Sequence, residues 1–120
     1  MLTLPPSTRI YMATARIDGR KGIDALANHV RNEFHRDPFD GHLFVFFSRR
    51  ADRARLLHWD HNGYVLILKR LEKGTFHVPA VPAEGTCQTV EAADLMLILQ
   101  GIDLSGARRR PRWDPPSTPR

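Results

Sequence analysis

The sequence contains a single cysteine, Cys87, among its 120 residues. One cysteine excludes an internal disulfide and a zinc site built from cysteines, and it fits a reducing compartment. No apolar run approaches the roughly 18 residues that a membrane-spanning helix requires. The first residues also lack the charged and apolar regions of a signal peptide. We therefore expect a cytoplasmic protein that does not contact a membrane.

Patterns for catalysis and metal binding are also scarce. His58, Asp60 and His61 are close in sequence, but no fourth ligand is evident, and Asp60 is equally suited to bond the backbone of the turn that follows it. The acidic residues considered for a nuclease site are Asp24, Asp37 and Asp40. Their spacing forms no carboxylate pair, and Cys87 has no clear base partner. We expect no catalytic residue, no metal ion and no cofactor.

What the sequence does contain is a series of short apolar runs between residues 41 and 79. The runs cover residues 42–47, 54–59, 64–71 and 75–78. Each has the length and the aromatic and branched residues of a strand. The breaks between them are short, and Asn62-Gly63 offers the positive φ angles of a tight hairpin turn. Such short connections join antiparallel neighbours, so the pattern predicts a meander of four strands.

Two helices and one more strand are expected around the meander. Residues 9–13 are typical of a short edge strand, and a stripe at helical spacing predicts a helix from Gly22 to Phe34. Thr89 is a plausible N-cap for a second helix over residues 90–100. The predicted fold is α+β: an antiparallel four- to five-stranded meander with two helices packed on one face. The other face would be covered by the N-terminal segment, the tail or another chain.

This fold is expected to form one domain over residues 1–104. Residues 105–120 are basic and rich in proline, which predicts a mobile tail. The formal net charge of the whole chain is +5. A modest positive excess favours contact with a polyanion such as DNA or RNA without fixing a fold.

The basic residues fall into groups, and the hairpin near residue 50 holds the first of them. Its members are Arg49, Arg50, Arg53 and Arg55. A two-stranded ribbon fits the major groove of DNA, where arginines contact phosphates or read guanine. A solvated turn is the structural alternative. The tail carries a second group, Arg108, Arg109, Arg110 and Arg112, suited to phosphate contact without sequence preference. Trp113 would stack on a base or pack on the uncovered sheet face.

Two secondary groups are weaker candidates. Arg16, Arg20 and Lys21 precede the first helix, where backbone N–H groups help to hold a phosphate. An ordinary charged connector is the alternative. The last group is Lys69, Arg70 and Lys73. Adjacent residues on a strand point to opposite faces, so Lys69 and Arg70 do not serve one flat surface, and protection of a sheet edge is the favoured interpretation.

Several segments together resemble a known protein family. They are Arg20–Leu26, Asp37–Phe46, Asp52–Phe76 and Leu99–Asp103. In order and spacing they are similar to the TnpB-type accessory protein, the product of the second open reading frame in insertion sequences of the IS66 family. The resemblance covers about residues 5–104. In two turns the sequence departs from the family, since Ala51 stands where glycine is frequent and Gly19 where a larger residue is common.

The resemblance implies a role in DNA transposition beside a separate, larger transposase, and it supplies no mechanism. Our leading hypothesis is a non-enzymatic accessory factor that binds DNA through the hairpin arginines and the basic tail. The alternative is a protein adaptor that docks on the transposase, or self-associates, through the second sheet face. A small metal-dependent nuclease is a third and weaker hypothesis.

Overall fold

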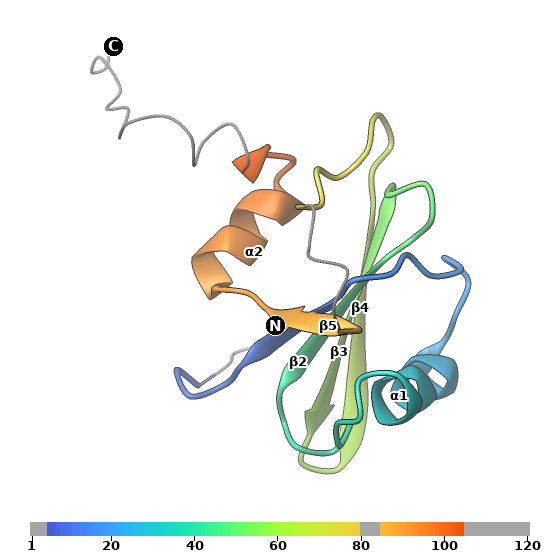
Figure 1. The fold of residues 1–120 in the computed structure, drawn as a ribbon, viewed down its shortest axis with the longest axis vertical. Helices are drawn as coiled ribbons and strands as arrows, with labels where there is room; N and C mark the ends of the chain where they lie inside the picture. The colour runs from blue at the N-terminus through green and yellow to red at the C-terminus, as the bar shows by residue number, and fades with distance from the viewer. Residues whose placement is uncertain (1–4, 80–84, 105–120) are drawn as a thin grey trace.

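The computed structural model describes residues 5–79 and 85–104, and its centre is a meander of three antiparallel strands (Figure 1). The strands are β2 (Leu43–Phe47), β3 (Arg53–Asp60) and β4 (Gly63–Arg70). They agree with the first three predicted runs to within one residue at each end. Strand-forming side chains and short polar breaks were sufficient to define them.

The fourth predicted strand, residues 75–78, is wrong. This segment is irregular, and its Phe76 N–H donates to the Ala51 carbonyl. The Phe76 ring is buried and packs on Phe47 at 5.5 Å between ring centroids. Val78 also packs against the same core cluster, so side-chain burial holds the segment without a strand partner.

The hairpin between β3 and β4 forms where it was predicted, with a different turn geometry. The left-handed conformation falls on His61, at φ 52°, instead of on Asn62 or Gly63. Gly63 is already paired with Asp60 as the first residue of β4. The prediction placed the positive φ angles one to two residues too late in the chain.

Two further strands extend the meander into a mixed sheet. β1 (Ile10–Ala13) pairs in parallel with β2, and β5 (Cys87–Thr89) pairs antiparallel with β1, which gives the order β4-β3-β2-β1-β5. The prediction of a purely antiparallel sheet is therefore wrong for one pair of strands, β1 and β2. Residues 14–42 provide a connection long enough for a parallel crossover. β1 lies inside the sheet, not at its edge, because β5 covers its outer side.

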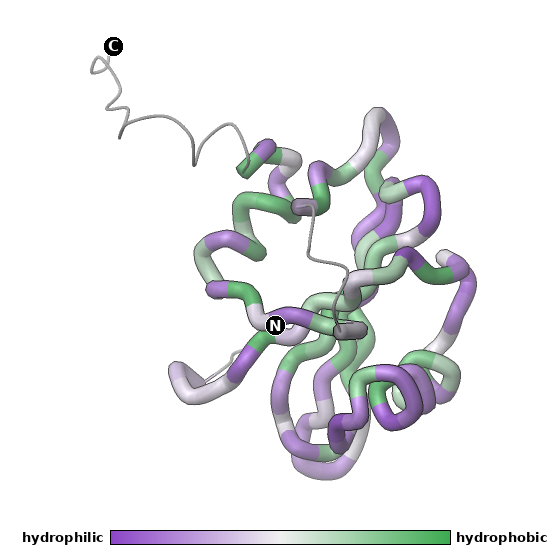
Figure 2. The backbone as a smooth tube through the Cα atoms, viewed as in Figure 1, coloured by the Kyte–Doolittle hydropathy of each residue, from purple (hydrophilic) through white to green (hydrophobic). Residues whose placement is uncertain are grey.

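The α+β class is confirmed, but the two helices do not share one face. α1 (Ile23–Asn32) packs on the side of the sheet that carries Phe44 and Phe46, whereas α2 (Ala92–Leu99) packs on the side that carries Val45. Figures 1 and 2 show the helices on either side of the mainly hydrophobic central strands. All residues of β1 and β2 are buried. A sheet that is apolar on both faces requires a cover on each.

The two helices differ in how they agree with the prediction. α1 buries the predicted stripe of Leu26, Ala27 and Val30 and exposes polar residues on its outer side. α2 begins after Glu91, without a side-chain cap, because Thr89 belongs to β5. None of the helices in the described part of the chain has the length and apolar character to cross a bilayer.

Candidate nucleic-acid interface

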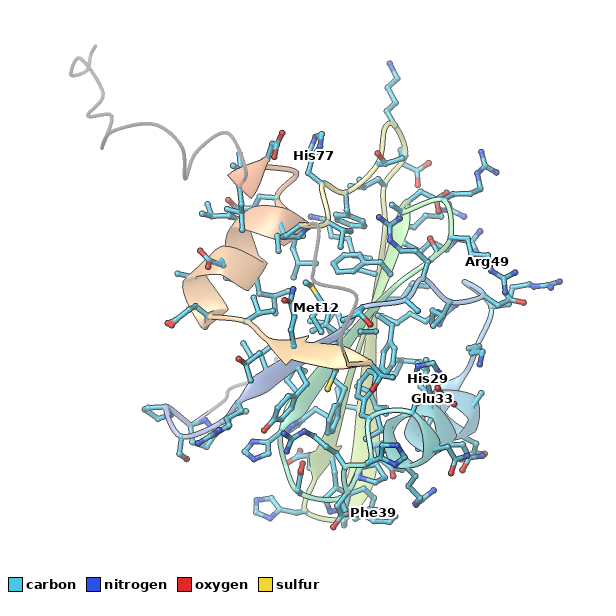
Figure 3. The ribbon with its side chains drawn as sticks, in the orientation of Figure 1. Met12, His29, Glu33, Phe39, Arg49 and His77 are labelled. Carbon is cyan, nitrogen blue, oxygen red and sulfur yellow. The ribbon has the colours of Figure 1, made fainter. Side chains whose placement is uncertain are left out.

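The turn between β2 and β3 presents two adjacent arginines to solvent. The Ser48 hydroxyl donates to an Asp52 carboxylate oxygen at 3.0 Å and accepts from the Arg53 backbone N–H at 3.1 Å. These bonds, with that from the Ala51 N–H to the Ser48 carbonyl at 2.8 Å, close the turn. Arg49 and Arg50 at its tip are exposed. In Figure 3 the Arg49 side chain extends away from the body of the molecule.

A second basic segment, residues 16–21, is joined to this turn. The Ile17 N–H donates to the Phe47 carbonyl at 3.0 Å, and the Arg49 N–H donates to the Ile17 carbonyl at 3.1 Å. The Ile17 side chain is buried in the core on the α1 side. The sequence prediction treated the connector group and the hairpin group as separate. The one signal that they meet was Ile17, a single apolar residue in an otherwise polar connector.

The joined segments form a shallow groove with a volume of about 270 Å³. Four arginines line it, Arg20, Arg49, Arg50 and Arg53, and we refer to them as the arginine surface. Arg16 is exposed beside it, and Lys21 is half-buried at the start of α1. The structure thus brings most of the hairpin group and part of the connector group together.

Acidic side chains neutralise only part of the arginine surface. Arg20 donates from Nε and Nη2 to the two carboxylate oxygens of Asp18 at 3.2 and 3.1 Å. Hydrogen bonds from Arg20, with a contribution from the charge of Arg49, lower the pKa of Asp18 to about 2, so the carboxylate is ionised at all working pH values. Among the described residues, Arg49, Arg50 and Arg53 form no ion pair. These three guanidinium groups therefore have no carboxylate within ion-pair distance, although Asp18 and Asp52 line the same groove.

Arg55 has a different environment from its neighbours in the predicted group. Its guanidinium donates to the Gly19 carbonyl from Nε at 3.0 Å and also from Nη2. The side chain is half-buried, so it ties β3 to the connector instead of reaching outward. The connector lies close to the turn, because a Cβ at Gly19 would approach the Cβ of Ser48 to 3.1 Å.

The group at the end of β4 is divided between the two sheet faces, as predicted. The Lys69 ammonium donates to the Leu99 carbonyl at 2.7 Å on the α2 side. Arg70 lies directly opposite Arg53 in the β3–β4 register and pairs with Glu72 at 3.2 Å. Like charges in opposite cross-strand positions reduce sheet stability. Arg70 therefore adds positive charge beside the arginine surface, partly offset by Glu72, and Lys73 is exposed in the following turn.

The remaining candidates do not extend the site. The tail arginines 108–110 and 112, and Trp113, lie outside the described residues. At the far end of the sheet, a cavity of about 560 Å³ is lined by His42, His58 and His61 together with aromatic residues. Among the residues that the structure describes, no group of three or more His, Cys, Asp or Glu side chains is placed to hold a metal ion.

Ala51 determines how the turn presents its arginines, because it occupies the left-handed region at φ 57°. We expect Ala51→Gly to change the free energy of unfolding by less than about 1 kcal/mol, since relief of left-handed strain is offset by a lost buried methyl group and a more flexible unfolded chain. Ala51→Val should cost about 2 kcal/mol or more, because branched residues avoid positive φ. Urea unfolding followed by circular dichroism measures both.

The matched control is Ala25→Val, at an exposed position of α1. Helix propensity alone predicts a cost of about 0.5 kcal/mol there. Equal stability of the glycine and valine variants at position 51 would contradict a left-handed turn residue.

Comparison with known proteins identifies one family. A profile described as IS66 Orf2-like protein matches residues 8–109. Two uncharacterized proteins of Sinorhizobium fredii, y4jC and y4hO, are 34% and 36% identical to the chain over 103 residues. Each alignment covers 86% of this chain, and it covers 86% and 88% of the respective relatives. No solved structure gave a significant match.

Proposed function

The chain belongs to the IS66 Orf2-like family of insertion-sequence proteins, and from this premise we propose that it is a non-enzymatic accessory factor of transposition that binds DNA through the arginine surface. The observation that carries the proposal is the convergence of residues 16–21 and 48–53, with three guanidinium groups that form no ion pair in the described structure. One planar guanidinium group can donate two parallel hydrogen bonds to a phosphate, which suits arginine to a nucleic-acid backbone.

The shape of the site supports the same proposal. The β2–β3 hairpin ends in a narrow turn with exposed Arg49 and Arg50, and a two-stranded ribbon is narrow enough to enter the major groove. Arg53 and Arg20 lie behind the tip, where they contact the flanking phosphates. Arg55 and Ile17 act as positioning residues that hold the two segments together.

The test is binding of the full chain to labelled DNA that carries the terminal inverted repeats of the insertion sequence, compared with scrambled DNA across a salt series. Each phosphate contact contributes about 0.9 to the slope of log affinity against log salt. Three free arginines predict a slope of about −2.7 or steeper. A slope near zero, or no binding at low salt, would overturn the proposal. The series is repeated with the partner transposase, which reports whether the two proteins bind DNA together.

A specific observation also favours the adaptor alternative, but at a different surface, because α2 covers the second sheet face that was predicted to dock on the transposase. α2 is apolar on its outer side, where Met96 is 56% exposed and Leu97 36%, and Ile102 beside it is 43% exposed. A complex with the transposase that depends on burial of apolar surface persists at about 0.5 M salt, whereas binding to DNA through phosphate contacts weakens by orders of magnitude. A transposase complex that survives high salt and is lost in Met96→Lys/Leu97→Lys would favour the adaptor function.

A further inference from the structure

Most of the outer edge of β4 lacks the devices that usually protect a sheet edge, because its charged residues, Lys69 and Arg70, stand only at its end. Among the described strands β4 pairs with β3 alone, one residue to one from Gly63 to Arg70, without a bulge. The run from Gly63 to Leu68 contains neither a charge nor a proline. Ile67 is 37% exposed and Leu68 is 49% exposed, on opposite faces of the strand. A long, regular and apolar edge is a template for another strand.

We propose that β4 pairs antiparallel with β4 of a second copy of this chain, about a two-fold axis that passes between the two Ile67 residues. In this register Leu66 faces Leu68 of the second copy, Val65 faces Lys69, and Tyr64 faces Arg70. The exposed apolar side chains then meet apolar partners across the pair, and the two five-stranded sheets become one. Two-fold pairs of identical surfaces are the commonest closed assemblies.

Charge and the pairing of exposed apolar side chains together select this register among those available to the strand. A pairing centred on Lys69 would set two ammonium groups opposite each other, which is destabilising. A pairing centred on Leu66 would leave Lys69 opposite Gly63, which offers its stem no side chain to pack against. A pairing centred on Leu68 would set the exposed Ile67 opposite Lys69. The register centred on Ile67 gives both exposed residues, Ile67 and Leu68, apolar partners and places both cations of β4 opposite uncharged residues with side chains.

The other edge of the sheet is less suited to the same role. β5 has only three residues, Cys87–Thr89, and so offers a much shorter run of backbone groups than the eight residues of β4. The self-complementary pattern of β4 also distinguishes a second copy from an unrelated strand, because an unrelated strand would have no reason to match the positions of Lys69 and Arg70.

The two-fold axis has a consequence for DNA that rests on the proposed function. With the usual strand spacing and rise, the hairpin turns of the two copies lie roughly 30–40 Å apart. That separation is close to one turn of B-form DNA, about 34–36 Å, the distance at which dimeric proteins contact successive grooves. The dimer would thus offer two arginine surfaces to one face of a duplex.

Sedimentation of the full chain without DNA, at about 0.5 M salt, tests the pairing separately from DNA binding. We expect a dimer for the native chain. Ile67→Lys sets two cations at the axis and removes an apolar contact from each copy, so it should raise the dimer dissociation constant at least about tenfold. Ala25→Lys adds the same charge at an exposed position of α1 and should leave dimerisation unchanged. Circular dichroism establishes that both variants are folded.

Single cysteines test the register. In a Cys87→Ser background, Ile67→Cys should form a disulfide-linked dimer on air oxidation, because opposed residues of paired strands have closely spaced Cβ atoms. Val65→Cys should not, because it faces Lys69 of the second copy. A native chain that sediments as a monomer at about 100 µM overturns the proposal, as does efficient crosslinking at position 65 but not at 67. Loss of DNA binding with the dimer intact would reject the proposed function alone.

Discussion

Replacing Arg49, Arg50 and Arg53 together by alanine is expected to reduce DNA affinity by about two to three orders of magnitude at 0.1 M salt, since each phosphate contact contributes nearly a tenfold factor at that ionic strength. The slope of log affinity against log salt should become shallower by about 2.7. None of these guanidinium groups has an ion-pair partner in the described structure, so their removal breaks no ion pair there. Fluorescence anisotropy across a salt series measures affinity and slope together.

Two controls separate local contact from net charge. The first replaces Arg9, Arg31 and Arg36, which removes the same three charges elsewhere; Arg31 lies over the Phe39 ring and Arg36 over the Tyr11 ring. Phe39 marks the end of the molecule remote from Arg49 (Figure 3). This control should lose far less affinity than the hairpin variant, and an equal loss would mean that overall charge, not the arginine surface, drives binding.

The second control changes affinity in the opposite direction. In the native chain the Arg20 backbone N–H donates to an Asp18 carboxylate oxygen at 2.9 Å. Asp18→Asn keeps an oxygen that accepts this bond and removes the charge that neutralises the Arg20 guanidinium. DNA binding should therefore strengthen, and the salt slope should steepen by up to about one unit. A weaker affinity in this variant would place the bound DNA away from residues 16–21.

Phe46→Ala is expected to lower the free energy of unfolding by about 3–5 kcal/mol, the usual cost of a large cavity in a core. The ring is fully buried in β2 and stacks on Phe34 at 5.6 Å between centroids, with His29 edge-on at 5.6 Å. It therefore holds α1 and the segment that follows it against the sheet. For a domain whose total stability is typically about 5–15 kcal/mol, this loss is a large fraction.

Urea unfolding followed by circular dichroism measures the effect. Phe46→Leu retains much of the apolar volume and should cost clearly less than the alanine variant. Met96→Ala, at a side chain that is 56% exposed, should change stability by about 0.5 kcal/mol or less. A loss below about 1 kcal/mol for Phe46→Ala would contradict the packing of α1 on β2.

Local chemistry explains why much of the fold could be predicted. The strands β2 to β4 follow from short runs of branched and aromatic residues between turn residues, and the α1 stripe follows from helical spacing. Two of the failures, a strand that does not form and a strand that was missed, have tertiary causes. Residues 75–78 have the composition of a strand but meet the core through the side chains of Phe76 and Val78, without strand pairing. Cys87–Thr89 forms a strand because it pairs with the edge of β1.

The candidate site was predictable in part. Arg49, Arg50 and Arg53 were identified from their position at a hairpin, which depends on neighbours in the sequence. That Arg20 shares their groove, and that Arg55 is bonded to the Gly19 carbonyl, depends on contacts between residues about 30 or more positions apart. No local pattern fixes the geometry of such pairs.

By itself the sequence determined the family, the α+β class, the meander and the cationic hairpin. Each of these follows from the spacing of neighbouring residues or from segments that resemble those of the family. Only the tertiary structure decided that the helices take opposite faces, that β1 runs parallel to β2, and which arginines keep their charge. The physical reason is that two apolar sheet faces each need a cover, and the long connections of the chain carry α1 to one face and α2 to the other.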